Sequence, residues 1–182
     1  MQIGIQLDSK TITARWAFLE FRSQRWQQHY AAFQPNNIRQ GVAFADLTPQ
    51  EVDHLEYMAR QYRAGLVGAL DPFALWESQA WTKDQLGRTL TIPRMAPNRN
   101  SHIPFLSFIA CPRFLNSKGT PEAGDPRTDA DTVPLDAPFN QDEPVIVAPV
   151  NGAPMLIDGY RRGVLFMRTP HPNATIKVWY PL

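Results

Sequence analysis

The chain has 182 residues and a formal net charge of +1, so it can bury a core but has no strong general attraction to nucleic acid. Its single cysteine, Cys111, excludes an internal disulfide and a cysteine cluster for zinc. The first residues lack the basic start and long apolar run of a secretory signal, and no window has the apolar length of a membrane span, so we expect a soluble, cytoplasmic protein.

The beginning of the chain changes from an alternating pattern to helical spacing. Apolar and polar residues alternate over residues 2–7, which predicts a short strand or an extended arm. From Ser9 the apolar residues recur at the spacing of a helix, which we expect to end at Pro35.

Two more helices are predicted in the first half. Thr48 and Glu51 form a capping box with proline at the first helical position, so a helix is expected to begin there. Asp71, followed by proline, predicts a third helix that runs to about Ala80. We therefore interpret residues 1–86 as a strand or arm followed by a helical unit.

The predicted first helix mixes arginines with aromatic residues, a composition found on nucleic-acid-binding surfaces. Because the aromatics fall at core spacing and acidic residues balance the charge, a solvated helix face is favoured for Arg15, Arg22 and Arg25. His29 and His54 each lack a second ligand at metal spacing, so we interpret both as surface or half-buried histidines.

The middle of the chain contains a basic loop, an apolar run and a long acidic stretch. The loop carries Arg94 and Arg99. The run 103–111 predicts a buried strand with Cys111 as a core thiol. Residues 116–142 are rich in proline and acids, and long loops of this kind are functional or disordered.

The last part of the chain has the clearest local signals. A β-branched run bounded by prolines is followed by an Asn-Gly dipeptide, the strongest short hairpin signal. The predicted order is strand, turn, strand, helix, strand, at residues 143–150, 151–152, 155–157, 160–168 and 175–180.

A site for an anion is predicted where the second of these strands leads into the helix. Gly159 permits a tight turn, and Arg161 and Arg162 stand in the first helical turn, where free backbone N–H groups also attract a phosphate. Asp158 either caps the helix, the commoner use, or coordinates Mg²⁺ beside that phosphate. Tyr160 either stacks on a base or packs in the core.

Residues 143–180 resemble the amino-terminal domain of the ParB partition proteins and, more widely, the ParB/sulfiredoxin superfamily. In that family a strand after a proline leads through a hairpin to a glycine, and an arginine three residues further opens a helix. These positions are Gly159 and Arg162 here. The resemblance implies that residues 87–182 form an α+β domain, a small mixed sheet with packed helices.

The resemblance also implies a phosphate pocket, which the family uses for nucleotide binding and hydrolysis, nuclease activity, phosphotransfer or sulfinic-acid repair. Tyr160 stands where sulfiredoxins have cysteine and partition proteins commonly have glutamate, and Arg161 replaces a histidine of other relatives. These departures argue against sulfinic-acid repair and against hydrolysis by the partition-protein mechanism.

The function expected from these observations is that of a stand-alone ParB-like domain that binds a nucleotide with Mg²⁺ and acts as an NTPase or phosphotransferase, or only binds. Glu143, Asp158 and His171 are the candidates for a catalytic base. The alternative without a ligand is that a structural acid, for example from residues 116–142, forms a salt bridge with these arginines.

Two other functions stay open. A non-enzymatic DNA- or protein-binding module would use arginines of the basic loop, Arg94 and Arg99, with those of the first helix. A nuclease would need carboxylates gathered around a metal ion, and the candidates are Asp125, Asp129, Asp131 and Asp136.

Overall fold

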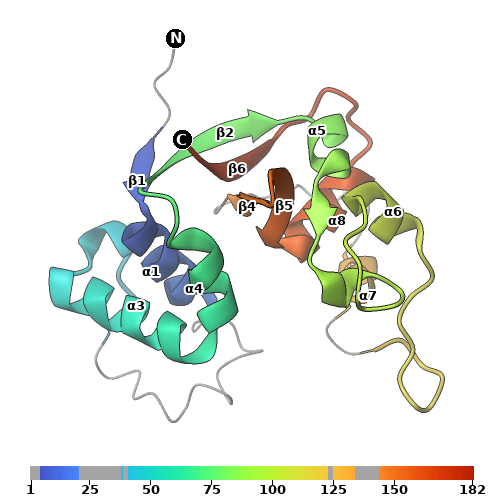
Figure 1. The fold of residues 1–182 in the computed structure, drawn as a ribbon, viewed down its shortest axis with the longest axis horizontal. Coiled ribbons are helices and arrows are strands. Elements are labelled where there is room, and N and C mark those ends of the chain that lie inside the picture. The colour runs from blue at the N-terminus through green and yellow to red at the C-terminus, as the bar shows by residue number, and fades with distance from the viewer. Residues whose placement is uncertain (1–4, 21–37, 39–40, 123–124, 134–143) are drawn as a thin grey trace. The chain divides into compact units, whose positions relative to one another are not determined.

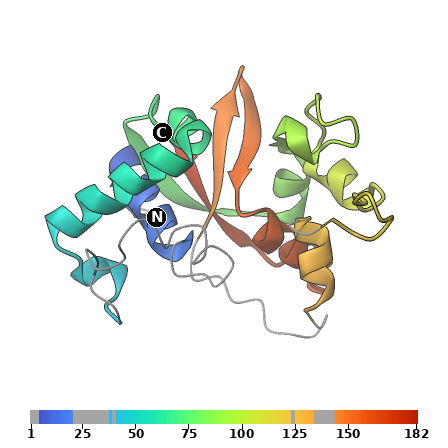
Figure 2. The same cartoon turned by 90° about the horizontal axis from the view of Figure 1, so that it is seen from below.

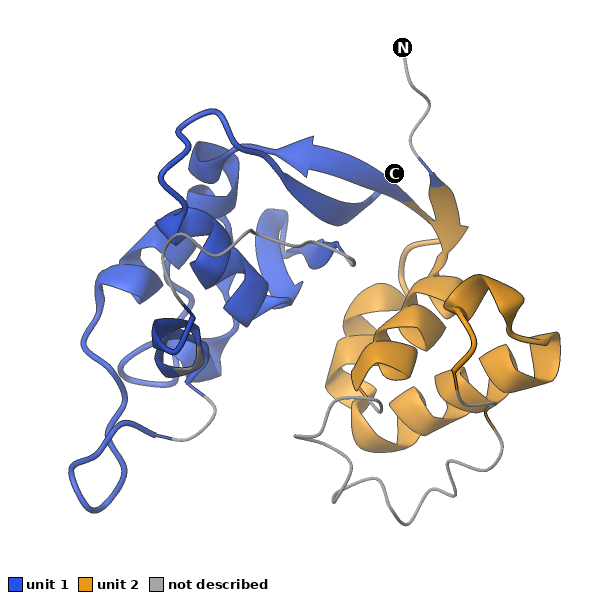
Figure 3. Ribbon diagram, turned by 180° about the vertical axis from the view of Figure 1, so that it is seen from behind, with its two compact units in different colours: residues 1–5, 77–181 blue, residues 6–76, 182 orange. Residues whose placement is uncertain are grey.

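The computed structural model describes residues 5–20, 38, 41–122, 125–133 and 144–182 (Figure 1). Its contacts divide the chain into two compact units (Figure 3). The N-terminal unit comprises residues 6–76 with Leu182, and the C-terminal unit comprises residues 77–181 with Ile5. The main segment of the C-terminal unit begins at residue 77. The sequence indicated a boundary after residue 86, with one compact domain over the whole chain as the alternative.

The N-terminal unit is built mainly from helices. Its elements are β1 Gln6–Asp8, α1 Ser9–Glu20, the 3-10 turn η3 Phe44–Asp46, α3 Pro49–Tyr62 and α4 Ala64–Leu70. Helix α1 packs against α3, and its part of the core includes Ile12 and Trp16. The predicted first helix therefore begins where expected, and its continuation after Glu20 lies outside the described residues.

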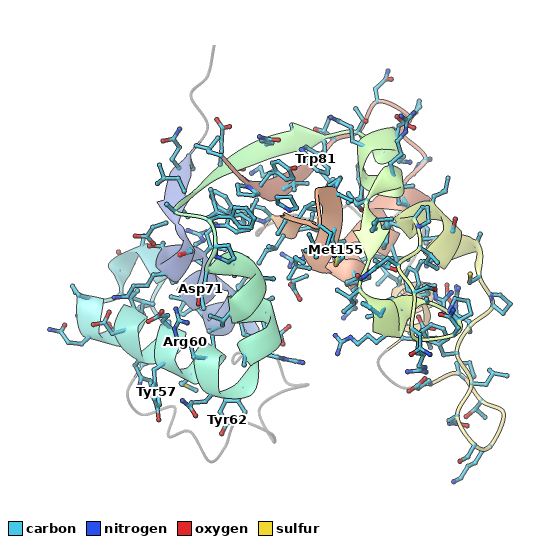
Figure 4. All side chains as sticks on the ribbon, in the orientation of Figure 1. Tyr57, Arg60, Tyr62, Asp71, Trp81 and Met155 are labelled. Atoms are coloured by element: carbon cyan, nitrogen blue, oxygen red, sulfur yellow. The ribbon has the colours of Figure 1, made fainter. Side chains whose placement is uncertain are left out.

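The capping box predicted for the second helix is confirmed. The Thr48 side chain accepts a hydrogen bond from the Glu51 backbone N–H, and the Glu51 carboxylate accepts from the Thr48 N–H at 2.7 Å. A second contact ties α3 to the end of α4, because both terminal nitrogens of Arg60 donate to the Asp71 carboxylate (Figure 4). This fork fixes the helical hairpin from the solvent side.

The third predicted helix is wrong. Asp71 ends α4, and residues Leu75–Trp81 form strand β2. Trp76 is fully buried. The ring of Trp81, which is labelled in Figure 4, packs against the ring of Tyr180, with 5.4 Å between the ring centroids. Pairing within a sheet and burial of these rings outweigh the weak local helix signal, as tertiary context commonly does for short segments.

The remaining elements belong to an α+β arrangement. The strands are β2, β3 Leu90–Thr91, β4 Val145–Val150, β5 Ala153–Asp158 and β6 Ile176–Pro181. The helices are α5 Lys83–Arg88, α6 Phe105–Ala110, α7 Pro126–Asp131 and α8 Tyr160–Arg168, and Pro93–Met95 form the 3-10 turn η4. One six-stranded sheet has the order β1-β2-β6-β4-β5-β3. The sheet is mixed, because β4 runs antiparallel to β5, whereas β6 runs parallel to β4 and β3 runs parallel to β5.

The predicted hairpin is confirmed and forms a two-stranded ribbon (Figure 2). Asn151 and Gly152 have φ values of 52° and 81°, the left-handed conformation that a two-residue hairpin turn requires at both positions. Pro149 and Pro154 lie opposite each other on the two strands, two residues before and two residues after the Asn151-Gly152 turn. The chain then continues through α8, which supplies Val164 and Phe166 to the core between helices and sheet.

The apolar run 103–111 contains helix α6, Phe105–Ala110, where the sequence predicted a strand. Phe105 and Phe108 are both fully buried at helical spacing, whereas Leu106 between them is 58% exposed. A short apolar run fits either structure, and here the one-sided burial selects the helix. Cys111 follows the helix and is half-buried rather than part of the core.

Candidate functional site

The turn from β5 into α8 needs a glycine for two reasons. Gly159 has a φ of 92°, which non-glycine residues rarely adopt. A Cβ atom added there would lie 2.6 Å from Cγ1 of Val145 on the neighbouring strand β4. The close approach that we expected at this glycine is therefore to the protein's own sheet.

Arg162 is held by groups of the protein itself. One terminal nitrogen donates to the Asp158 carboxylate at 3.1 Å, and the other donates to the carbonyl oxygen of Pro144 at 3.1 Å. Both side chains of the ion pair are 27% exposed. Asp158 is thus an internal anion at this turn, whereas Asp136 and Asp142 of the acidic stretch lie outside the described residues. No side chain caps α8 among the described residues.

Tyr160 is a core residue rather than a platform for a base. It is 7% exposed, and its ring packs edge-on against Phe105 and Phe108. Its hydroxyl accepts from the Ile92 N–H at 2.7 Å and donates to the Leu156 carbonyl at 2.8 Å. The first turn of α8 is therefore attached to both β5 and the segment after β3.

The same surroundings act on the ionisation of Tyr160. Burial raises the pKa of the Tyr160 hydroxyl above its ordinary value and outweighs the hydrogen bond from Ile92 and the positive charge of Arg94, which both lower it. The charge of Asp158 raises the pKa further. The phenol is thus neutral in the folded protein.

Replacing Tyr160 by phenylalanine should lower the free energy of unfolding by about 1–3 kcal/mol, because the Ile92 N–H and the Leu156 carbonyl lose a buried partner. Urea unfolding measures this change. Tyr180→Phe is the matched control, since that hydroxyl has no hydrogen bond to the described residues and its removal should cost less than about 0.5 kcal/mol. Equal losses in the two variants would contradict the role of the Tyr160 hydroxyl.

Arg161 is an exposed cation at this turn. Arg161 lies in the first turn of α8, which contains no acidic residue. Within the described ranges, no oxygen accepts a hydrogen bond from the backbone N–H of Tyr160 or Arg161. Arg94 is exposed in the 3-10 turn η4. The turn therefore combines a helix N-terminus with the exposed Arg161 side chain.

The other arginines proposed for nucleic-acid contact are engaged elsewhere. Arg99 pairs with Glu122 and lies over the ring of Phe114, 4.7 Å from its centroid. Arg15 lies over the ring of Phe44 in the N-terminal unit. Arg22 and Arg25, like His29, fall outside the described residues.

Two of the three candidates for a base are described, and they lie at opposite ends of α8. Glu143 lies outside the described residues. His171 is exposed in the turn after α8, so it follows the opposite end of this helix, which is about 13 Å long, from Gly159. Asp158 stands at the turn, and its carboxylate pairs with Arg162.

Two of the four acidic residues proposed for a nuclease metal site have structural contacts. Asp125 caps α7 by accepting from the Arg127 N–H. Asp131 accepts hydrogen bonds from both Arg113 and Arg168. Nothing is described of the Asp129 side chain or of Asp136. The described part of the chain holds no group of three or more side chains suited to a metal ion.

Asp158 offers one carboxylate, and a magnesium ion held only by the protein needs several oxygen ligands in octahedral geometry. The ion enters the interpretation only as a companion of a bound nucleotide's phosphates.

The predicted loop 116–142 contains the most deeply buried charge of the described residues, which sequence reasoning missed. Arg127 and Asp125 form a salt bridge at 2.8 Å with both side chains fully buried. Arg127 lies between the rings of Phe108 and Phe114 and donates to two carbonyl oxygens at the end of α6. Asp125 followed by proline is a helix-start signal that predicts α7, but nothing local predicts the burial of Arg127.

The pKa of Asp125 reflects this pairing. Burial disfavours the charged carboxylate, but hydrogen bonds from the side chain and backbone of Arg127 and from the Phe114 N–H outweigh it. The pKa of Asp125 is therefore held below its ordinary value, and the carboxylate remains charged in the folded protein.

Comparisons of the chain with models of protein families, with curated proteins and with solved structures found no match. Among the residues that the structure describes, no helix is both long enough and apolar enough to cross a membrane. The interpretation of the site accordingly depends on its own geometry.

Proposed function

We propose that this chain binds a phosphate-bearing ligand at the first turn of α8, with a nucleotide as the leading candidate. The observation that carries the proposal is the exposed Arg161 beside backbone N–H groups that no described residue accepts from. A helix N-terminus and a guanidinium group are both complementary to phosphate oxygens. Arg94 adds a second exposed cation from η4.

The order of elements in residues 144–182 also supports this proposal. Strand, turn, strand, helix and strand follow one another as the resemblance to the ParB/sulfiredoxin superfamily implies. We extend that resemblance to a ParB-like fold of residues 87–182 as part of the same proposal. Arg162, at the family's arginine position, would orient the turn through Asp158 and Pro144 and leave Arg161 to contact the ligand.

The proposal is one of binding. Hydrolysis or phosphoryl transfer depends mainly on positioning and charge neutralisation, which the two exposed arginines can supply. Either reaction also needs a group that orients or deprotonates the nucleophile, and Asp158 is already paired with Arg162. NTPase or phosphotransferase activity is therefore a second question, to be asked after binding.

Arg161→Ala should weaken the binding of ATP, measured by isothermal titration calorimetry with and without Mg²⁺, by about tenfold to a hundredfold. The reason is that a charge-assisted hydrogen bond contributes about 1.5–3 kcal/mol. The melting temperature should not change, because the side chain is exposed and has no described partner. Lys118→Ala is the control, since it removes one exposed positive charge elsewhere in the same unit.

Absence of ATP binding by the unaltered protein, or equal binding by Arg161→Ala, would contradict the proposal. The DNA-binding alternative would give a different result. Affinity for duplex DNA carried by phosphate contacts of Arg94 and Arg161 should fall steeply with added salt, whereas affinity for a nucleotide with Mg²⁺ should fall much less.

A further inference from the structure

We propose that Asn151, at the tip of the hairpin formed by β4 and β5, is a site of spontaneous deamidation, and that opening of the hairpin turn controls the rate. Asn151 is the only asparagine of the sequence that precedes a glycine. Both residues of the dipeptide are exposed, and the Asn151 side chain makes no hydrogen bond with the described residues. The reaction needs neither a ligand nor the first turn of α8.

The nucleophile is the backbone nitrogen of Gly152. This nitrogen loses its proton and attacks the side-chain carbonyl carbon Cγ of Asn151, which closes a five-membered imide ring, and the side-chain nitrogen takes up a proton and leaves as ammonia. Water then opens the ring. Attack of water at Cγ gives aspartate, and attack at the backbone carbonyl carbon gives isoaspartate. In total, one side-chain amide and one water molecule become one carboxylic acid and one ammonia.

The closed turn keeps the two reacting atoms apart. Asn151 and Gly152 have φ values of 52° and 81°, as both central residues of a type I′ turn require. The first central residue of such a turn has a ψ of about 30°, which points the nitrogen of the next residue away from its own Cβ. Ring closure requires that nitrogen on the same side of the Cα–C bond as Cβ. The backbone at Asn151 must therefore leave the turn conformation before it reacts.

The tip of the hairpin is a place where such opening is least opposed. Strand β3 pairs with β5 at Met155 and Leu156, and β6 pairs with the first residues of β4, so no described strand borders the residues next to the turn. A Cβ atom added at Gly152 would meet nothing within 4 Å. Segments with few packed neighbours open at a lower free energy than the core.

Asn116 shows how another exposed turn restrains its asparagine. Its side-chain oxygen accepts hydrogen bonds from the backbone N–H groups of Lys118 and Thr120, and its side-chain nitrogen donates to the Thr120 hydroxyl. These bonds fix the side-chain amide, and the next residue is a serine. We therefore expect Asn116 to react more slowly than Asn151.

The products change the hairpin permanently. Either product adds one negative charge to a chain whose formal net charge is +1. Isoaspartate also adds one methylene group to the backbone between residues 151 and 152. A two-residue turn joins the strands only with the backbone geometry of an ordinary dipeptide, so isoaspartate should keep the tip of the hairpin open.

The rate of deamidation in the full chain tests this proposal. Peptide mapping by mass spectrometry, at mildly alkaline pH, measures aspartate and isoaspartate at position 151 in the folded protein and in urea. The rate in urea should be at least about tenfold higher, since the closed turn no longer protects the amide. Asn151 should also be modified before any other described asparagine.

Two variants distinguish opening of the hairpin from unfolding of the whole chain. Val150→Gly weakens the strand pair with Ala153 next to the turn, and should raise the rate in the folded protein about threefold to tenfold. The rate in urea should not change, because residue 150 takes no part in ring closure. Arg127→Lys disturbs a buried ion pair whose described contacts lie outside the hairpin, and should leave the rate in the folded protein unchanged.

Three results would overturn the proposal. Equal rates in the folded protein and in urea would show that the turn does not protect Asn151. Equal acceleration by Arg127→Lys and Val150→Gly would show that the reaction passes through global unfolding. Earlier modification of Asn116 would show that the site lies elsewhere. None of these results bears on the binding of a phosphate-bearing ligand at α8.

Discussion

Replacing Arg127 by methionine should lower the free energy of unfolding by about 3–5 kcal/mol, the cost of leaving one charge of a buried pair without its partner. The variant leaves the Asp125 carboxylate fully buried and takes donors away from the carbonyl oxygens of Phe108 and Cys111. It also removes the guanidinium from between the rings of Phe108 and Phe114. Urea unfolding followed by tryptophan fluorescence measures the loss.

Arg113→Met is the matched control for this prediction. Arg113 pairs with Asp131 on the surface, where the two side chains are 33% and 49% exposed. An ion pair of this kind contributes about 1 kcal/mol or less. If Arg127→Met unfolds before it can be measured, Arg127→Lys retains the charge but not the planar fork, and should lose an intermediate amount. A loss no greater than that of Arg113→Met would contradict the structural role of Arg127.

Gly159→Ala should destabilise the protein by about 2–5 kcal/mol, from two effects that add. An alanine in the left-handed conformation costs about 1–2 kcal/mol, and forcing a methyl group into a packed position costs about 1–3 kcal/mol more. The second cost follows from the 2.6 Å separation between the added Cβ and Cγ1 of Val145. The unfolding free energy again provides the measurement.

The hairpin turn offers a control that separates the two effects. Gly152 has a φ of 81°, close to that of Gly159, but a Cβ added there meets nothing within 4 Å. Gly152→Ala should therefore show the backbone cost alone, about 1–2 kcal/mol. If the two alanine variants lose equal stability, the contact between Gly159 and β4 is not the reason for the glycine.

The elements that the sequence predicted well are those with local causes. The capping box at Thr48, the Asn151-Gly152 turn and the glycine before α8 each act within a few residues, and each is present in the structure. The errors at residues 75–81 and 103–111 have a common origin. Both segments are short, and their structure depends on sheet pairing or one-sided burial that other parts of the chain supply.

The candidate site was predictable as a place but not in its contacts. The turn at residues 158–162 is where the sequence indicated, and the helix begins as expected. Asp158 and Arg162 are only four residues apart, so their pairing has a local cause. The hydrogen bond between Tyr160 and Ile92, in contrast, depends on packing between distant segments. Likewise, Arg127 is buried only because Phe108 and Phe114 enclose it.

The opposed prolines of the hairpin have a consequence for self-association. In the described pairings, β3 pairs with β5 only at Met155 and Leu156, and β6 pairs with β4 only at Val145 and Ile146, the first residues of β4. The half of the hairpin nearer its turn therefore has no described neighbouring strand. Such backbone invites the addition of strands from other molecules. Pro149 and Pro154 have no N–H to offer there, and so protect the ribbon against aggregation at the point where it is most open.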